Sequence, residues 1–311
     1  MITNDGIKFG ITGGAGFLGN VLIRKILNMG FQVTCMDNFN KGTCDSLLGV
    51  VNNSNFSFFQ GDVCNKSDCE KLAKKSDVII HLAAIVGFPA CKRQPVLSHE
   101  VNVNGTRNIV ESLSPRQRIV FASTGSVYGA LNDVCTEDSP LNPQSEYGIQ
   151  KKLAEDIVSN HPNSVSFRFA TALGVSPSMR VNLLANDFCF QALTNKCLTI
   201  FEADFRRTFI HVEDMARAFY FGATNKMLHK VYNCGDNNLN CTKRQLAEMI
   251  KEKTGCFVTY GEIGTDLDKR DYEVSYDRLN SEGFYCERNL SEGIDEILKA
   301  VPLLKIKHNY E

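Results

Sequence analysis

Short apolar runs alternate with amphipathic segments between Ile7 and Phe169. Runs rich in β-branched or aromatic residues predict strands at Ile7–Thr12, Gln32–Asp37, Phe56–Gln60, Val78–Leu82, Arg118–Ala122 and Ser164–Phe169. Apolar positions at helical spacing predict helices between them, at Phe17–Met29, Ser67–Lys74, Asn104–Leu113 and Tyr147–Asn160. This alternation is typical of parallel strands joined by crossover helices, so the predicted fold is α/β with a doubly wound parallel sheet. Such sheets bind ligands at the carboxyl ends of their strands.

The pattern changes after Gly174. Val175–Ser178 has the composition of a loop, and helical spacing recurs at Leu183–Thr194, His211–Thr224 and Thr242–Thr254, the last with Thr242 as its expected N-cap. No regular alternation of strands and helices is evident there. We therefore predict a sheet domain in residues 1–171 and a smaller α/β domain in residues 172–311, with some segments of the second part returning to the first.

Length and charge restrict the class of protein. The 311 residues are 43% hydrophobic and 22% charged, which is enough to bury a sizeable core. A net charge of −1 gives no general reason to bind nucleic acid or a membrane surface. Met1–Gly6 lacks the features of a signal peptide, and no apolar run approaches the roughly 20 residues that span a bilayer. We expect a cytoplasmic protein with no membrane or nucleic-acid partner.

Cysteine and histidine spacing predicts no metal site. The 12 cysteines are scattered, and the close pairs Cys64/Cys69 and Cys234/Cys241 do not fit a CxxC pattern. The 6 histidines form no HExxH motif. We expect reduced, mostly buried thiols and no metal ion.

A glycine-rich turn follows the first predicted strand. Thr12–Gly19 contains a GxxGxxG run that opens a helix, where glycines permit a tight turn and let backbone N–H groups approach a pyrophosphate. The second strand, which follows that helix, ends at Asp37, where a carboxylate can bind an adenosine ribose and would repel a 2′-phosphate. These features favour NAD over NADP, although Asp37-Asn38 could also be a plain turn.

A second acidic residue follows the third predicted strand. Asp62, in Gly61-Asp62-Val63, can reach the amino group of an adenine, and the alternative is a helix cap.

Two further segments carry candidate chemistry. Tyr147 and Lys151 have YxxxK spacing, which places both side chains on one helix face. A tyrosine base needs its pKa lowered from about 10, and a lysine ammonium nearby has the required charge. Thr124 lies in the hydroxyl-rich stretch after the fifth strand and can orient an alcohol toward Tyr147.

Together these motifs resemble those of the extended short-chain dehydrogenases/reductases, in the nucleotide-sugar epimerase and dehydratase family. The matching segments run nearly from end to end: Thr12–Gly19, Asp62-Val63, His81–Ala84, Asn102, Thr124 with Val127–Gly129, Tyr147 with Lys151, Arg207–Val212 and Arg270. The resemblance implies a Rossmann domain that binds NAD in residues 1–171, and a region that mainly binds a nucleoside-diphosphate sugar in residues 172–311.

The resemblance also implies roles for individual residues. Tyr147 takes the proton of the sugar 4-hydroxyl while carbon 4 gives hydride to NAD, Lys151 holds the nicotinamide ribose, and Thr124 bonds the same hydroxyl. The expected NAD contacts are Gly13, Ala15, Gly16, Phe17, Leu18, Gly19, Asp37, Asn38, Asp62, Val63, Leu82, Ala83, Ala84, Asn102, Ala122, Tyr147, Lys151 and Phe169.

Residues beside Thr124 separate the reactions of the family. Its 4,6-dehydratases carry Asp-Glu after this Thr, and its decarboxylating members place a Glu nearby, whereas this chain has Gly125-Ser126. Asp37 argues against NADP-dependent reductases. A 4-epimerase and a 4-dehydrogenase that releases the ketone both remain, and we favour the epimerase because it needs no external oxidant. A non-catalytic NAD-binding scaffold is disfavoured because Thr124, Tyr147 and Lys151 are all present.

The substrate diphosphate needs a few placed guanidinium groups in a chain of nearly zero net charge. Arg207 and Arg270 match the family's diphosphate positions, and Arg180 and Asn182 lie in the segment expected to cover the nucleotide. Gly125, Ser126, Tyr147 and Thr124 are expected to face the sugar. Thr171 stands where the family has Asn, and the stretch after it resembles a branch with members that act on GDP-heptoses, so we assume no galactose substrate.

By analogy, the helices near Asn104–Leu113 and Tyr147–Asn160 predict a homodimer.

Overall fold

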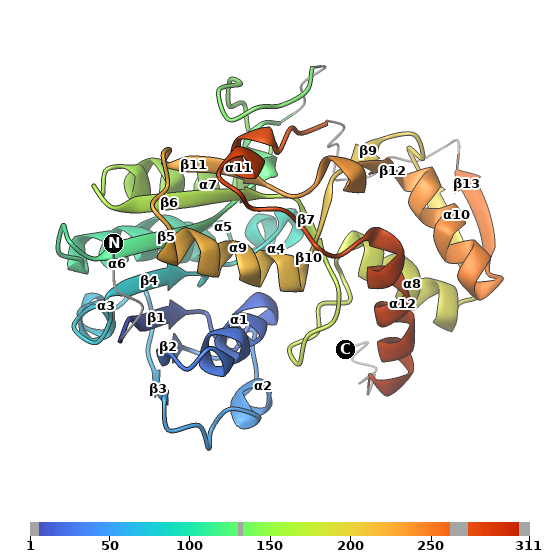
Figure 1. The fold of residues 1–311 in the computed structure, drawn as a ribbon. Coiled ribbons are helices and arrows are strands. Elements are labelled where there is room, and N and C mark those ends of the chain that lie inside the picture. Colours follow the sequence, from blue (N-terminus) through green and yellow to red (C-terminus); the bar gives the residue numbers. More distant parts are fainter. Residues whose placement is uncertain (1–5, 130–132, 262–272, 305–311) are drawn as a thin grey trace.

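A seven-stranded parallel sheet organises the computed structural model, which describes residues 6–129, 133–261 and 273–304 (Figure 1). The strand order is β11-β6-β5-β4-β1-β2-β3, and every neighbouring pair is parallel. The strands are β1 (Lys8–Thr12), β2 (Gln32–Asp37), β3 (Phe56–Gln60), β4 (Val78–His81), β5 (Arg118–Thr124), β6 (Ser164–Phe169) and β11 (Val231–Cys234). Strand order reverses between β1 and β4, which is where doubly wound sheets bind ligands.

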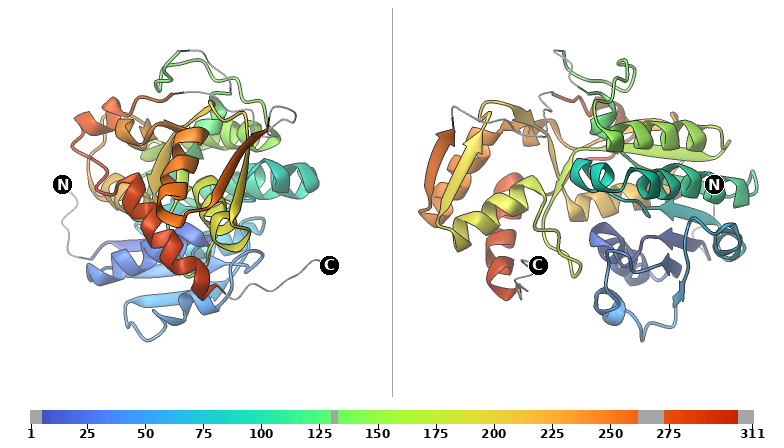
Figure 2. Two further views of the ribbon diagram at one scale, coloured as in Figure 1. Left: turned by 90° about the vertical axis from the view of Figure 1, so that its right-hand side faces the viewer. Right: turned by 180° about the vertical axis from the view of Figure 1, so that it is seen from behind.

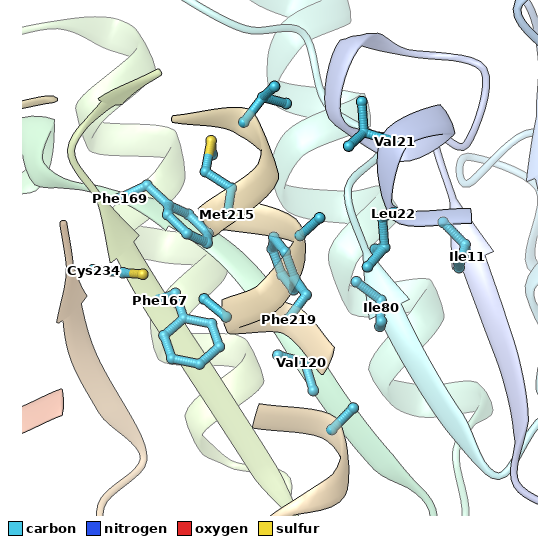
Figure 3. Packing of buried hydrophobic residues seen from close by; sticks show 14 of the residues in the cluster. Ile11, Val21, Leu22, Ile80, Val120, Phe167, Phe169, Met215, Phe219 and Cys234 are labelled. Carbon is cyan, nitrogen blue, oxygen red and sulfur yellow. The ribbon is translucent and has the colours of Figure 1, made fainter. Parts of the chain in front are cut away.

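Helices cover both faces of this sheet. On one face α1 (Phe17–Asn28) packs beside α9 (Val212–Thr224), and on the other α3 (Lys66–Ala73), α6 (Gly105–Ser112) and α7 (Glu146–Ser159) lie in sequence. Figure 3 shows the first face, where Leu22 and Phe219 meet Ile80 and Val120 of the central strands. Because β4 and β6 are buried on both faces, their sequences are almost continuously apolar or small.

All six predicted strands are present. β5 runs to Thr124, beyond the predicted end at Ala122, so Thr124 ends a strand instead of starting a loop. The helix predicted at Asn104–Leu113 is α6, preceded by a π-helical turn at Glu100–Asn104. Five helices were not predicted: the short α2 (Asp45–Leu48), α4 (Phe88–Arg93), α5 (Pro95–His99) and α11 (Asp277–Ser281), and the longer α12 (Leu290–Ala300).

The expectation that strand–helix alternation ends after Gly174 was wrong. α9 leads into β11, which pairs with β6 as the seventh strand of the main sheet. β11 is only four residues long, and Asn233 interrupts its apolar pattern, so it carries little strand signal. Asn233 is tolerated in the interior because its side chain bonds the Tyr128 hydroxyl, at 2.6 Å, and the Ser275 carbonyl.

A smaller group of elements lies beside the sheet (Figures 1 and 2). It has its own apolar core and contains α8 (Leu184–Thr194), α10 (Lys243–Thr254), α12 (Leu290–Ala300) and the parallel pair β8 (Cys197–Phe201) and β13 (Phe257–Gly261). Two short pairs, β7 (Thr171–Leu173) with β10 (Phe209–His211) and β9 (Arg206–Arg207) with β12 (Cys241–Thr242), accompany it, and α11 (Asp277–Ser281) lies near β11. Thr242 caps α10 as predicted, in a capping box with Gln245.

The chain enters the smaller group from the carboxyl edge of the main sheet. Only Ala170 separates the end of β6 from the start of β7. The two parts are also joined by a hydrogen bond of 2.8 Å between His211, which caps α9, and Glu296 of α12. The carboxyl edge of the sheet and the smaller group therefore face a common region.

Candidate active site

The glycine turn after β1 is closely fitted to the neighbouring strand end. Gly13 has a positive φ of 71°, and a Cβ there would lie 2.8 Å from the Ala83 nitrogen. A Cβ on Gly19 would lie 2.4 Å from the Gly13 oxygen. Gly16 caps α1 without a side chain, so the first-turn N–H groups of α1 face the turn that Gly13 begins. Exposed N–H groups at the start of a helix are what a pyrophosphate requires, and binding of a pyrophosphate here stays a prediction.

Acidic and amide side chains lie beside that turn. Asp37, at the end of β2, accepts hydrogen bonds from the N–H groups of Ala15 and Phe39 at 2.9 and 2.8 Å. Burial raises the pKa of Asp37, although these bonds oppose the rise. Asn38 donates to Asp62 at 2.9 Å. Burial favours a higher pKa for Asp62, but this bond and the one from the Cys64 N–H outweigh burial and lower the pKa. The structure thus brings Asp37, Asn38 and Asp62 together at one corner of the turn.

A buried histidine joins the strands on either side of the order reversal. Thr12 Oγ1 accepts the N–H groups of Leu82 and Ala83 at 3.1 Å, so its own proton is directed to His81 Nδ1 at 2.7 Å. The Nε2–H of His81 then donates to Thr106 at 3.0 Å. Burial, together with the charge of Lys151, lowers the pKa of His81 to about 3. His81 is therefore neutral and orients the Thr12 hydroxyl, which holds Leu82 and Ala83 opposite the glycine turn.

The three candidate catalytic residues come from β5 and α7. Thr124 ends β5 and accepts the N–H of Ser126 at 3.2 Å, while Ser145 caps α7 and places Tyr147 in its first turn. Gly148 allows the close contact of these elements, because a Cβ there would lie 2.8 Å from the Ser126 oxygen. The start of α7 therefore approaches the turn at Thr124, as the proposed chemistry requires.

Lys151 follows one helical turn later and is buried. Its Nζ lies 4.0 Å from the centroid of the Phe121 ring, which stacks on His81. Burial, opposed by the carboxylate of Glu155, lowers the pKa of Lys151 to about 7. A buried lysine whose pKa lies close to neutral pH is typical of functional sites.

This burial predicts a pH-dependent stability difference. In the unfolded chain Lys151 keeps its proton up to pH ~10.4, so between pH 7 and 10 the unfolded state binds more protons than the folded state. The stability of the wild-type protein therefore rises with pH in this range. In the cofactor-free protein, Lys151→Met should be more stable than wild type by roughly 2–4 kcal/mol at pH 6, with a difference that shrinks toward pH 10. Urea unfolding at both pH values measures it, and a constant difference would contradict the assignment.

Other predicted contacts occupy different environments. Ala122 lies on β5 and Asn102 is buried in the π-helical turn. Phe169 ends β6, and its ring packs 5.1 Å from that of Phe219 in the core beneath the sheet (Figure 3). Val63 is buried shortly after the end of β3. Their contacts to NAD stay predictions.

The segment after β7 carries Arg180 over the site. Ser176 donates to the Phe17 carbonyl at 2.6 Å, and Asn186 Nδ2 bonds the carbonyls of Gly174 and Arg180 at 3.0 Å, so both ends are anchored. Arg180 Nε lies 3.4 Å from Asn182 Oδ1. Burial lowers the pKa of Arg180, and the charge of Tyr147 opposes that shift, which places the guanidinium within electrostatic reach of Tyr147.

The remaining substrate candidates are distributed more widely. Thr171 starts β7 and donates its N–H to the Thr208 carbonyl. Arg207 is buried on β9 and donates to the Arg206 carbonyl at 3.0 Å. Arg270 lies outside the described residues. Sequence reasoning assigned no role to Ser176 or to Gln150, which lies inside the YxxxK motif, because neither residue type is diagnostic by itself.

The described ranges contain no group of three or more His, Cys, Asp or Glu that could hold a metal ion, and all 12 cysteines are free thiols. In the same ranges, no helix combines the length and the apolarity needed to cross a bilayer.

Comparison with known proteins agrees with this geometry. UDP-glucose 4-epimerase 3 of Oryza sativa is 32% identical over 185 residues, covering 56% of this chain and 47% of that enzyme, so the match spans about half the length of this relative. CDP-paratose 2-epimerase of Salmonella typhi is 29% identical over 79% of this chain and 83% of its own length. A crystal structure of the Thermus thermophilus UDP-glucose 4-epimerase with NAD superimposes with a TM-score of 0.83 at 23% identity, covering 95% of this chain and 99% of that one.

A family model matches more than half of the chain. The model described as the NAD dependent epimerase/dehydratase family matches residues 10–235, which include the glycine turn, Thr124, Tyr147 and Lys151. The chain is therefore a member of the NAD-dependent epimerase/dehydratase family of enzymes.

Proposed function

We propose that the protein is a nucleotide-sugar 4-epimerase that works through a 4-keto intermediate. The observation that carries this proposal is the approach of α7, with Tyr147 and Lys151, to Thr124 at the carboxyl edge of the sheet, beside the glycine turn. NAD, when bound, supplies a hydride acceptor and donor for carbon 4. The chain's own residues then move the proton and orient the sugar.

Each group has a distinct task in this scheme. The Tyr147 oxygen takes the proton of the 4-hydroxyl and later returns it, and the Thr124 hydroxyl bonds the same oxygen and orients it. The buried ammonium of Lys151 holds the nicotinamide ribose and favours the phenolate of Tyr147. Gly125 and Ser126 leave no second acid–base pair beside Thr124, which supports turnover without elimination.

Arginines supply the expected recognition of the substrate. Arg180 and Arg207 lie in partly or fully buried positions, where a guanidinium binds phosphate oxygens in paired fashion. We assign them, with Asn182 and Arg270, to the nucleoside diphosphate. The base and the sugar are left open, and a GDP-heptose is as compatible as a UDP-hexose.

A panel of UDP-, GDP-, CDP- and dTDP-sugars tests the proposal. A purified sample with bound NAD is incubated with each compound while NADH absorbance is followed and products are identified by NMR. A 4-epimer without lasting NADH supports the epimerase. Accumulating NADH with a 4-keto sugar would instead identify the 4-dehydrogenase, and no turnover of any compound would overturn both.

We also propose a homodimer through α6 and α7. Ile149 and Leu153, one turn apart on α7, are 42% and 40% exposed, and Val96 and Leu97 of neighbouring α5 are exposed as well. The double variant Ile149→Lys/Leu153→Lys should be monomeric in light scattering, with the circular dichroism of wild type. A wild-type protein that is monomeric at micromolar concentration would contradict the dimer.

A further inference from the structure

One fully buried side chain lies between the two motif residues of α7. Gln150 is 0% exposed, and its amide group contacts Asn102, Ser98 and Glu146. Asn102, in the π-helical turn, is 2% exposed and Ser98 of α5 is 0% exposed. A buried polar network of this kind stabilises one arrangement only when every member is satisfied.

Hydrogen bonding fixes the orientation of each amide in the network. The Ile85 N–H can only donate, so Asn102 Oδ1 faces it, at 2.8 Å. Asn102 Nδ2 then donates to the Ile85 carbonyl at 3.0 Å and to Gln150 Oε1 at 2.8 Å. Gln150 Nε2 is left to donate to Ser98 Oγ at 2.8 Å and to Glu146 Oε1 at 3.0 Å. Both amides use both donor hydrogens and the acceptor.

The network connects the two walls of the candidate site. Ile85 follows directly on Leu82, Ala83 and Ala84, and Ala83 lies against the glycine turn. Gln150 immediately precedes Lys151 and lies in the helical turn that Tyr147 begins. The chain of hydrogen bonds therefore runs from the segment that lines the cofactor cleft, through Asn102, to the helix that carries the candidate base.

We infer that Gln150 is a positioning residue that holds Tyr147 and Lys151 in register with the segment Leu82–Ile85. This inference rests on the proposed function, because it specifies how the proposed site is kept in its working geometry. Misplacement of a reacting group by about 1 Å can cost on the order of 100-fold in rate. Loss of the Gln150 amide should therefore affect turnover and cofactor binding more than substrate binding.

The test compares Gln150→Leu with Gln117→Leu. Gln117 makes three comparable amide contacts, to the Ala73 and Ser76 carbonyls and the Ser114 N–H, at the opposite, amino end of the strands. We expect Gln150→Leu to lower kcat by about 10- to 100-fold, to change the sugar KM by less than about threefold, and to weaken NAD binding by about tenfold. The pH profile of kcat should also move, and Gln117→Leu should change none of these.

A double variant tests whether Gln150 acts through Asn102. The kcat and NAD affinity of Gln150→Leu/Asn102→Leu should be no lower than those of Asn102→Leu alone, since both changes break the same connection. Should Gln150→Leu fail to fold, Gln150→Met removes the amide but keeps a long, flexible side chain, and it should show the same changes.

Either of two results would overturn the inference. One is a Gln150→Leu protein whose kcat and NAD affinity lie within twofold of those of Gln117→Leu, and the other is additive effects in the double variant. NAD affinity is measured by calorimetry without sugar. The role of Gln150 is therefore decided even if no nucleotide sugar is turned over and the proposed function fails.

Discussion

Replacing Tyr147 with Phe should lower kcat by about 10²- to 10⁴-fold while NAD stays bound. The substitution removes one oxygen from a side chain in the first turn of α7 and leaves its apolar contacts with the core on that face of the sheet. The 4-hydroxyl proton would then have no base at that position. Steady-state kinetics on the compound identified in the panel, with the NAD content of each sample, gives the comparison.

Tyr285→Phe is the matched control, because Tyr285 is 59% exposed and belongs to none of the segments assigned to the site. It should keep wild-type kcat. If Tyr147→Phe turned over at near-normal rate while holding NAD, the assignment of Tyr147 as the base would be abandoned.

The second large effect concerns stability. Glu155 of α7 and Arg168 of β6 are both buried, with the Arg168 Nη2 to Glu155 Oε1 distance at 2.6 Å and Nε 3.1 Å from both carboxylate oxygens. Burial favours a lower pKa for Arg168, but the hydrogen bonds that it donates to the Glu155 carboxylate outweigh burial and raise the pKa. Glu155→Gln leaves a buried guanidinium without its charge partner and should cost about 3–5 kcal/mol of unfolding free energy.

Urea unfolding followed by circular dichroism measures that loss. The double variant Glu155→Leu/Arg168→Met should recover much of it, because two apolar side chains leave no unpaired charge. On the same helix, Lys152 and Asp156 form an exposed ion pair at 2.7 Å, so Asp156→Asn should cost less than about 1 kcal/mol. Equal losses from Glu155→Gln and Asp156→Asn would contradict this account.

Much of the main sheet could be predicted because most of its strands are buried on both faces. Continuous apolar runs such as residues 78–80 have few competing interpretations. β11 was missed because its place depends on pairing with β6, which lies far earlier in the chain, and on Asn233 finding partners in Tyr128 and Ser275. Neither condition is visible in the short sequence of the strand itself.

In the candidate site, too, some features could be predicted from the sequence and others could not. Motif spacing placed Tyr147 and Lys151 on one helix face, and a glycine turn before a helix indicated the dinucleotide site. The anchoring of Arg180 through Ser176 and Asn186 depends on contacts between distant parts of the chain, as in the bond from Ser176 to Phe17. Gln150 has an ordinary helix-forming side chain, and only its burial against Asn102 distinguishes it.

The most direct test of 4-epimerisation uses a substrate of the panel labelled with deuterium at carbon 4. If hydrogen leaves carbon 4 and returns to its other face within one active site, the 4-epimer keeps the deuterium and no NADH accumulates. We expect retention of the label at carbon 4 in NMR and mass spectra. Loss of the deuterium from carbon 4, with a released ketone and accumulating reduced cofactor, would contradict the epimerase.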